Sequence, residues 1–173
     1  MLLGAARDPG TLVVGLDAVA APMARASRLA ARPVARGGRA NALFVVAGIE
    51  APPAELIGRA DRVTVSFPWG SLLGGVLGLD ARAQAGLVSL LAPSGSIDAL
   101  VSVEARDGLG DLDGWLTERS LGAKWSELGF ELTEIRPARP SEVEASGSSW
   151  ARRLGAVTAD RRRVTRLRLC RLP

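Results

Sequence analysis

The stretch TLVVGLDAVAAPMARASRLAARPVARGGRANALFVVAGIE, residues 11–50, decides the fold class. It opens on the apolar run Thr11–Leu16, continues through a helical stretch over Ala20–Arg32 and reaches a second apolar run at Ala42–Ala47. Short runs that are apolar throughout are typical of strands covered on both faces, and Pro33 with the glycines after it ends the helix between them. The stretch therefore predicts a β-α-β unit.

The same alternation continues along the rest of the chain. The last expected strand alternates arginines with leucines, which predicts an edge strand or a strand with one solvated face. Alternating strands and helices indicate an α/β fold with an open, mostly parallel sheet, and we expect one domain over residues 1–173. The further strands are expected at Arg62–Ser66, Ser96–Val103, Phe130–Pro137 and Val164–Leu169, and the further helices at Pro53–Gly58 and Leu79–Leu91.

Residue counts exclude several kinds of site. The chain has no histidine, and Cys170 is its only cysteine, which excludes histidine-dependent triads, zinc clusters and disulfide frameworks. We therefore expect no metal site. No apolar run approaches the roughly 18 residues of a membrane helix, and the opening MLLGAARD lacks the regions of a signal peptide, so we expect a cytoplasmic protein without a membrane partner.

Positive charge is unevenly distributed along the chain. Residues 136–173 hold 10 arginines against three acidic residues, and residues 18–49 hold five arginines and no acidic residue. Such segregation favours a polyanionic partner, most simply a nucleic acid. A solvated basic surface without a partner explains the same pattern, and charge alone leaves both interpretations open.

Acidic residues follow the first two expected strands. Ligands of open α/β sheets bind beyond the carboxyl ends of the strands, where Asp17 and Glu50 stand. A carboxylate there can bind the vicinal hydroxyls of a ribose, although Asp17 can equally cap the helix that begins near Val19. If Asp17 ends a second strand, a first strand and a glycine-rich turn should precede Thr11. Only ten residues precede Thr11, however, and they contain no GxGxxG motif.

The segment FPWGS, Phe67–Ser71, follows the third expected strand. A proline and an aromatic residue at a strand end make a rigid ledge, and a flat indole there can stack on a purine that has turned out of its helix. The alternative is that Trp69 plugs the end of the sheet.

A second aromatic segment, SSWARRL, carries Trp150 beside Arg152 and Arg153 and precedes the triplet Arg161–Arg163. An indole interleaved with arginines is expected of RNA contact, although Trp150 could pack on the domain while the arginines face water. Trp115 and Trp125 lie in ordinary amphipathic stretches, and we interpret both as packing residues.

Together, FPWGSLLGGVLG and SSWARRLG resemble the aminoglycoside-resistance 16S rRNA methyltransferases of the kanamycin–apramycin type. VVGLDA, PVARGGRAN and VVAGIEAPP are similar to that family's second strand, the linker after it and its third strand, so the resemblance covers essentially residues 1–173. It implies a Rossmann-like, S-adenosylmethionine-dependent methyltransferase fold. It also implies methylation of N1 of adenine 1408 in the ribosomal decoding site, after which kanamycin and apramycin no longer bind.

The resemblance assigns roles to individual residues. Asp17 would hold the ribose hydroxyls of S-adenosylmethionine, residues from Ala47 to Glu50 would border its adenine, and we also place Pro68 and Ser71 at the cofactor. In the catalytic site, Trp69 and Trp150 would sandwich the flipped adenine, Ser149 or Ser148 would fix the tryptophan segment, and Arg153 would match the arginine after that tryptophan. The arginines assigned to rRNA phosphates are Arg28, Arg32, Arg36, Arg39, Arg152, Arg161, Arg162 and Arg163.

Departures from the family pattern shape the remaining expectations. The family's first strand and glycine-rich cofactor loop have no counterpart here, so we expect an N-terminally truncated member that acts as a monomer on the small ribosomal subunit. Three alternatives stay open: a methyltransferase acting on tRNA guanine, a non-catalytic RNA-binding remnant, and a fragment that does not fold alone.

Overall fold

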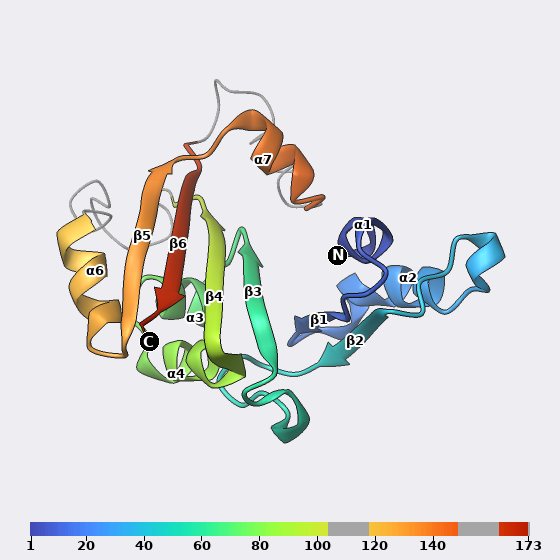
Figure 1. Cartoon of the computed structure of the whole chain (residues 1–173), viewed down its shortest axis with the longest axis horizontal. Coiled ribbons are helices and arrows are strands. Elements are labelled where there is room, and N and C mark those ends of the chain that lie inside the picture. The colour runs from blue at the N-terminus through green and yellow to red at the C-terminus, as the bar shows by residue number, and fades with distance from the viewer. Residues whose placement is uncertain (104–117, 149–162, 173) are drawn as a thin grey trace. The chain divides into compact units, whose positions relative to one another are not determined.

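The computed structural model describes residues 1–103, 118–148 and 163–172 (Figure 1). The chain divides into two compact units, Met1–Pro52 (unit 1) and Pro53–Pro173 (unit 2), and each unit has its own sheet. That residues 1–173 make a single domain stays a prediction. In the described part of the chain, no helix combines the length and the apolar character needed to cross a membrane.

Unit 1 is the small β-α-β unit that the sequence predicts, and a helix precedes it. Strands β1 and β2 pair in parallel, with Val13 opposite Ala42 and Asp17 opposite Val46. Its elements in chain order are helix α1 (Leu2–Arg7), strand β1 (Val13–Asp17), helix α2 (Ala20–Ala30), the 3₁₀ turn η1 (Val34–Arg36) and strand β2 (Ala42–Val46).

Two local features hold unit 1 together. The chain returns from α2 to β2 through Gly38, where a Cβ atom would lie 1.6 Å from the carbonyl oxygen of Arg32, so only glycine fits this approach. Asn41 lies just before β2, and its Nδ2 donates to the carbonyl oxygens of Ala5, Asp8 and Thr11 at 3.0, 3.1 and 2.8 Å. These contacts tie the connection between α1 and β1 to the start of β2.

Unit 2 contains a four-stranded sheet in the order β3-β4-β6-β5. Strand β3 pairs in parallel with β4, while β6 runs antiparallel to both of its neighbours, so the sheet is mixed, with β6 alone reversed. The elements of unit 2 are η2 (Ala54–Leu56), β3 (Ala60–Ser66), α3 (Gly70–Val76), α4 (Ala81–Leu90), β4 (Leu91–Val101), α6 (Glu118–Ser126), β5 (Phe130–Pro137), α7 (Pro140–Ala145) and β6 (Thr165–Arg171).

Two details of the sequence prediction are wrong. The helix expected over Pro53–Gly58 is a single 3₁₀ turn, since Pro53 precedes it and Gly58 already has a positive φ of 69°. Strand β4 begins at Leu91, directly after α4, and not at Ser96, because Leu91 already pairs with Ala60 of β3. Of the two alternatives for the last strand, an edge position is excluded, because β4 and β5 pair with the two sides of β6, and a strand with one solvated face remains.

The sheet of unit 2 has one apolar and one polar face. Along β6, Leu167 and Leu169 are 0% exposed, whereas Arg166 and Arg168 between them are half-buried, as the alternation predicts. Trp125 is fully buried and meets the ring of Phe130 edge-on at 5.6 Å, which confirms its packing role. Trp115 lies outside the described residues.

Candidate functional site

The candidate site of unit 2 lies where β3, β4 and β5 end and β6 begins. The register pairs Ser66 with Leu100, Val101 with Thr165, and Thr165 with Pro137, which brings these four strand ends to one edge of the sheet. Figure 1 shows α7 beyond this edge, after β5. It is the edge at which open α/β sheets bind their ligands.

The FPWGS turn leaves the sheet through an unusual backbone conformation. The Phe67 N–H donates to the carbonyl of Leu100 at 2.8 Å, which extends the β3–β4 pairing by one residue. Phe67 then adopts a φ of 54° and Gly70 a φ of 58°, so left-handed residues stand on both sides of Pro68 and Trp69. A bulky residue in this region costs about 1 to 3 kcal/mol, which surrounding contacts must offset.

The contacts that offset this cost are made by the side chain of Phe67. The Phe67 side chain is only 5% exposed and belongs to a buried cluster with Leu100, Val143 and Val164. Pro68 is buried as well, whereas the Trp69 side chain is 72% exposed. The indole therefore does not plug the sheet end, and a rigid turn presents it to solvent.

Unit 1 carries the residues assigned to the ribose and adenine of the cofactor. Asp17 ends β1, and its Oδ1 accepts the N–H of Val19 at 2.9 Å, but Val19 is the N-cap residue of α2 and no side chain caps this helix, so the capping alternative is not realised. Its carbonyl accepts the N–H of Ala47 at 3.0 Å, which places Asp17 and Ala47 side by side at the ends of β1 and β2. Glu50 is half-buried and lies close to Gly48, where a Cβ atom would come within 2.7 Å of its carboxylate.

Exposed arginines lie on α2 and in the segment after it. Arg25, Arg28, Arg32 and Arg36 are all exposed; Arg25 and Arg28 are three residues apart on α2 and share one side of it, whereas Arg32 and Arg36 follow its end. Arg39 differs, because it is half-buried and its Nη1 donates to the carbonyl of Gly38 at 2.7 Å. Its buried Nε has no partner among the described residues.

The remaining predicted residues are placed only in part. Ser71 is exposed in the first turn of α3, and Arg163 is exposed just before β6, with its carbonyl accepting the Ser102 hydroxyl at 2.9 Å. The candidates Ser149, Trp150, Arg152, Arg153, Arg161 and Arg162 lie outside the described residues.

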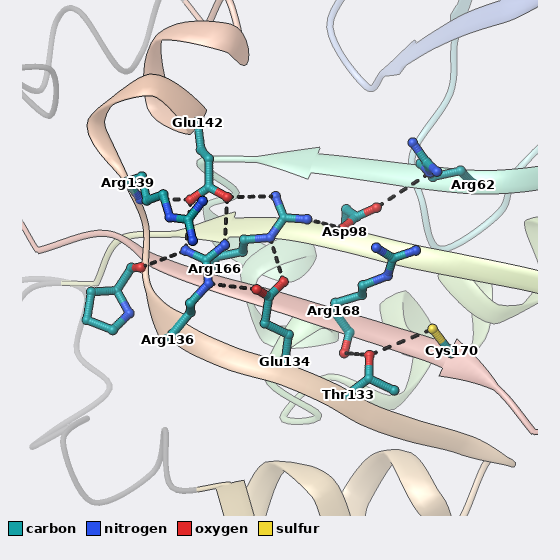
Figure 2. Close-up of polar contacts among 11 residues, drawn as sticks. Arg62, Asp98, Thr133, Glu134, Arg136, Arg139, Glu142, Arg166, Arg168 and Cys170 are labelled. Atoms are coloured by element: carbon teal, nitrogen blue, oxygen red, sulfur yellow. Dashed lines mark hydrogen bonds and ion pairs between the residues drawn. The ribbon is translucent and has the colours of Figure 1, made fainter.

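A charged network on the polar face of the sheet was missed by sequence reasoning (Figure 2). Arg166 on β6 donates to Asp98 on β4 at 2.8 Å and to Glu134 on β5 at 2.7 Å. Arg136 donates to both carboxylate oxygens of Glu142 on α7, at 2.9 and 2.7 Å, and to Glu134 at 2.6 Å. The network ties α7 to β5 and β6 and thereby fixes the chain beside the candidate site.

Hydrogen bonds in this network lower the pKa values of Glu134 and Glu142. The Arg136 guanidinium, helped by the backbone N–H of Arg139, lowers the pKa of Glu142 to about 2. The Arg166 guanidinium lowers the pKa of Glu134. Both acids therefore stay ionised at neutral pH and balance the arginines against which they pack.

Comparisons with known proteins agree with this architecture. The family model "NpmA: 16S rRNA (adenine(1408)-N(1))-methyltransferase" matches residues 2–169. A 16S rRNA (adenine(1408)-N(1))-methyltransferase of Streptoalloteichus tenebrarius is 33% identical over 163 residues, which cover 87% of this chain and 72% of the relative. An rRNA methyltransferase of Saccharopolyspora hirsuta is 34% identical over 139 residues, covering 76% of this chain and 88% of that protein.

Solved structures show the same likeness. The 16S rRNA methyltransferase KamB superposes with a TM-score of 0.84 at 30% identity, covering 99% of this chain and 82% of its own. A tryptophan-to-alanine mutant of the Catenulisporales acidiphilia 16S rRNA (adenine(1408)-N(1))-methyltransferase, solved with cosubstrate SAM, superposes with a TM-score of 0.82 at 28% identity, covering 99% of this chain and 80% of its own. The chain has the α/β fold of these methyltransferases and belongs to the NpmA family of 16S rRNA (adenine(1408)-N(1))-methyltransferases.

Proposed function

We propose that this chain transfers the methyl group of S-adenosylmethionine to N1 of adenine 1408 in 16S rRNA and so confers resistance of the kanamycin–apramycin type. Family membership supports the reaction. The observation that carries it is the indole of Trp69, which is 72% exposed although the two residues before it, Phe67 and Pro68, are buried. A large aromatic surface left in water at the ligand-binding edge of a sheet suits stacking on an extruded base.

The reaction depends more on the correct placement of the two reactants than on acid–base catalysis. When bound, the cofactor supplies an electrophilic methyl group, which is transferred as the N1–carbon bond forms and the carbon–sulfur bond breaks, its electron pair remaining on sulfur. The lone pair of adenine N1 is free to attack without a general base, which fits a chain without histidine. Correct alignment of the two reactants can then supply most of the rate acceleration.

Residues at the ends of β1 and β2 fit the nucleoside part of the cofactor. Asp17 uses Oδ1 to accept the N–H of Val19, while Oδ2 accepts no hydrogen bond in the part of the chain that the structure describes. This second carboxylate oxygen can accept a hydrogen bond from a ribose hydroxyl. Ala47 and Glu50, which follow β2, would border the adenine, and Pro68 and Ser71 remain proposed cofactor contacts in unit 2.

The target adenine would lie against Trp69. We propose that Trp150 covers its other face, that Ser149 fixes this second tryptophan and that Arg153 pairs with the nearby rRNA backbone. Stacking offsets the free energy of extruding the base, and the π-faces of two indoles stabilise the positive charge that develops on the methylated ring.

The basic surfaces would bind the rest of the RNA. The exposed side chains of Arg28, Arg32 and Arg36 stand near one another along the chain of unit 1 and suit phosphates of the RNA backbone. We assign Arg39, Arg152 and Arg161–Arg163 to the same role. We further propose that the chain acts as a monomer on the small ribosomal subunit, which places it in the cytoplasm.

Primer extension tests this function directly. Purified small subunits are incubated with the chain and S-adenosylmethionine, and reverse transcription is run across the decoding site, where an N1-methylated adenine blocks pairing. A stop at adenine 1408 that requires the cofactor is the expected result. No stop, with small subunits still retained in a filter-binding assay, would instead identify an RNA-binding protein without this activity, and methyl transfer to tRNA would identify another substrate.

A further inference from the structure

Helix α7 supports the turn that presents Trp69 through one buried side chain. Val143 of α7 is 3% exposed and lies in the same buried cluster as Phe67, Leu100 and Val164. Leu100 accepts the backbone hydrogen bond of Phe67, and Val164 directly precedes β6. The cluster therefore joins α7 and the sheet to the first residue of the FPWGS turn.

Phe67 needs this support because its backbone conformation is unfavourable. Its φ is 54°, in a region that bulky residues rarely occupy, and Pro68 after it favours an extended backbone at residue 67 instead. A residue keeps such a conformation where the contacts around it hold it there. Since the backbone of Phe67 sets the direction in which the chain continues towards Trp69, the contacts of the Phe67 side chain also fix where the indole is presented.

The polar network fixes α7 independently of the cluster. Glu142, the residue before Val143, accepts two hydrogen bonds from Arg136 of β5 at 2.9 and 2.7 Å, and its Oε1 lies 3.6 Å from Nη1 of Arg166 on β6. The same carboxylate accepts the N–H of Arg139 at 2.7 Å at the start of α7. Ion pairs at residue 142 and apolar packing at residue 143 thus hold the helix in one orientation.

We propose that Val143 is a positioning residue of the methyl transfer, which holds Phe67 in its left-handed conformation and thereby keeps the indole of Trp69 oriented for the target base. The inference rests on the proposed function, because the orientation of the indole affects catalysis only if a base stacks on it. Val143 touches neither base nor cofactor in this scheme and acts through Phe67.

The Phe67 amide reports on the turn without any need for activity, because it donates to the carbonyl of Leu100 at 2.8 Å. The Arg59 amide, which donates to the carbonyl of Leu90 at 3.0 Å just before β3, is the internal reference. In hydrogen exchange followed by NMR, Val143→Ala should raise the ratio of the Phe67 rate to the Arg59 rate about tenfold, through local opening of the turn. Val143→Ile should leave the ratio close to that of the wild type.

Two further variants separate positioning from a general loss of core packing. Val101→Ala removes the same atoms from another buried valine, on the face of β4 opposite Leu100, and should leave the exchange ratio unchanged. Glu142→Gln weakens the attachment of α7 while every side chain of the cluster stays, and should raise the ratio about threefold. If Val143→Ala does not fold, Glu142→Gln decides in its place, and a ratio no higher than that of Val101→Ala overturns the proposal.

Methylation kinetics supply the second readout. Val143→Ala should lower kcat about tenfold while the KM for S-adenosylmethionine stays within about twofold, because Asp17 and Ala47 lie in unit 1. Equal exchange ratios in Val143→Ala and Val101→Ala overturn the proposal whatever the activity, and so does a raised ratio with kcat unchanged. A wild-type chain that never methylates small subunits overturns the proposed function and, with it, the catalytic role of Val143, whatever the exchange ratio.

Discussion

Unit 1 buries few apolar side chains, whereas unit 2 buries many large ones. The buried hydrophobic residues of unit 1 are Ala5, Ala30, Ala42 and Ile49, and six of the eleven exposed large hydrophobic side chains in the described part of the chain also lie in this unit. Unit 2 has a core that includes Trp125, Phe130, Leu87, Ile97, Leu167 and Leu169. Since burying a large side chain contributes about 1.5 to 3 kcal/mol, the apolar stabilisation is concentrated in unit 2.

This contrast matches the different roles that we propose for the two units. Unit 2 uses its core and its ion pairs to hold one exposed side chain, Trp69, on a constrained turn. Unit 1 presents polar groups instead, namely Asp17 and the arginines of α2, on elements held together by a small apolar cluster around Ala5, Ala30 and Ala42 and by the hydrogen bonds of Asn41. Stacking on the target base is therefore expected from unit 2, and binding of the cofactor ribose from unit 1.

The largest expected effect is in the core of unit 2. Trp125→Ala should lower the free energy of unfolding by about 3 to 5 kcal/mol, because it opens a cavity beside Phe130 and leaves the Val76 carbonyl without the indole N–H that donates to it at 3.1 Å. Urea unfolding followed by circular dichroism measures the change. A loss below about 1 kcal/mol would contradict the core described for unit 2.

Next in size is the RNA affinity of unit 1. Arg28→Ala combined with Arg32→Ala should weaken binding to small subunits about tenfold at low salt and reduce the slope of log affinity against log salt by roughly two, one for each phosphate that is no longer neutralised. The matched control is Arg59→Ala with Arg82→Ala, which removes two exposed arginines from unit 2. Equal losses in both double variants would show that net charge, and not the position of these arginines in unit 1, sets the affinity.

Glu142 should give unit 2 a stability that depends on pH. Its pKa is about 2 in the folded chain against an ordinary value of 4.5, so its stabilisation is complete above pH 4.5 and is lost as the pH falls towards 2. Glu142→Gln should therefore cost about 1 kcal/mol at pH 7 and much less near pH 2. The exposed Glu144 supplies the control, since Glu144→Gln should leave the pH dependence of the free energy of unfolding as it is in the wild type. A difference in unfolding free energy between the wild type and Glu142→Gln that does not become smaller towards pH 2 would refute the ion pairing.

The smallest effect is expected on the surface of unit 1. Leu43 is 51% exposed on β2, so Leu43→Thr should change the free energy of unfolding by no more than about 0.5 kcal/mol. The same substitution at the buried Leu169 of β6 should cost several times as much. Equal costs at the two positions would show that unit 1 buries β2 as fully as unit 2 buries β6.

Much of this fold could be predicted from local patterns. All six expected strands are present, and the alternation in β6 correctly identifies its buried leucines. The position of β6 between β4 and β5 could not be predicted, because the sequence of one strand does not determine which distant strand pairs with it or in which register. The charged network depends on this register and on an irregularity between Leu132 and Glu134 in β5, which is why it was missed.

The site was predictable to a similar degree. The FPWGS motif indicated an aromatic ledge, and the structure exposes Trp69 there. The conformation of Phe67 was not predictable, since a residue before proline favours extended backbone and only the contacts of its side chain with Val143 and Val164 explain the positive φ. Long-range packing therefore decides how the motif is presented.

The central claim is that unit 2 exposes Trp69 for the target base and not for its own stability. The direct test is Trp69→Ala, assayed by primer extension on small subunits alongside urea unfolding of the same preparation. The predicted result is loss of the stop at adenine 1408 with the free energy of unfolding changed by no more than about 0.5 kcal/mol. A stop of wild-type strength in this variant, under conditions in which the wild-type chain is active, would contradict the account.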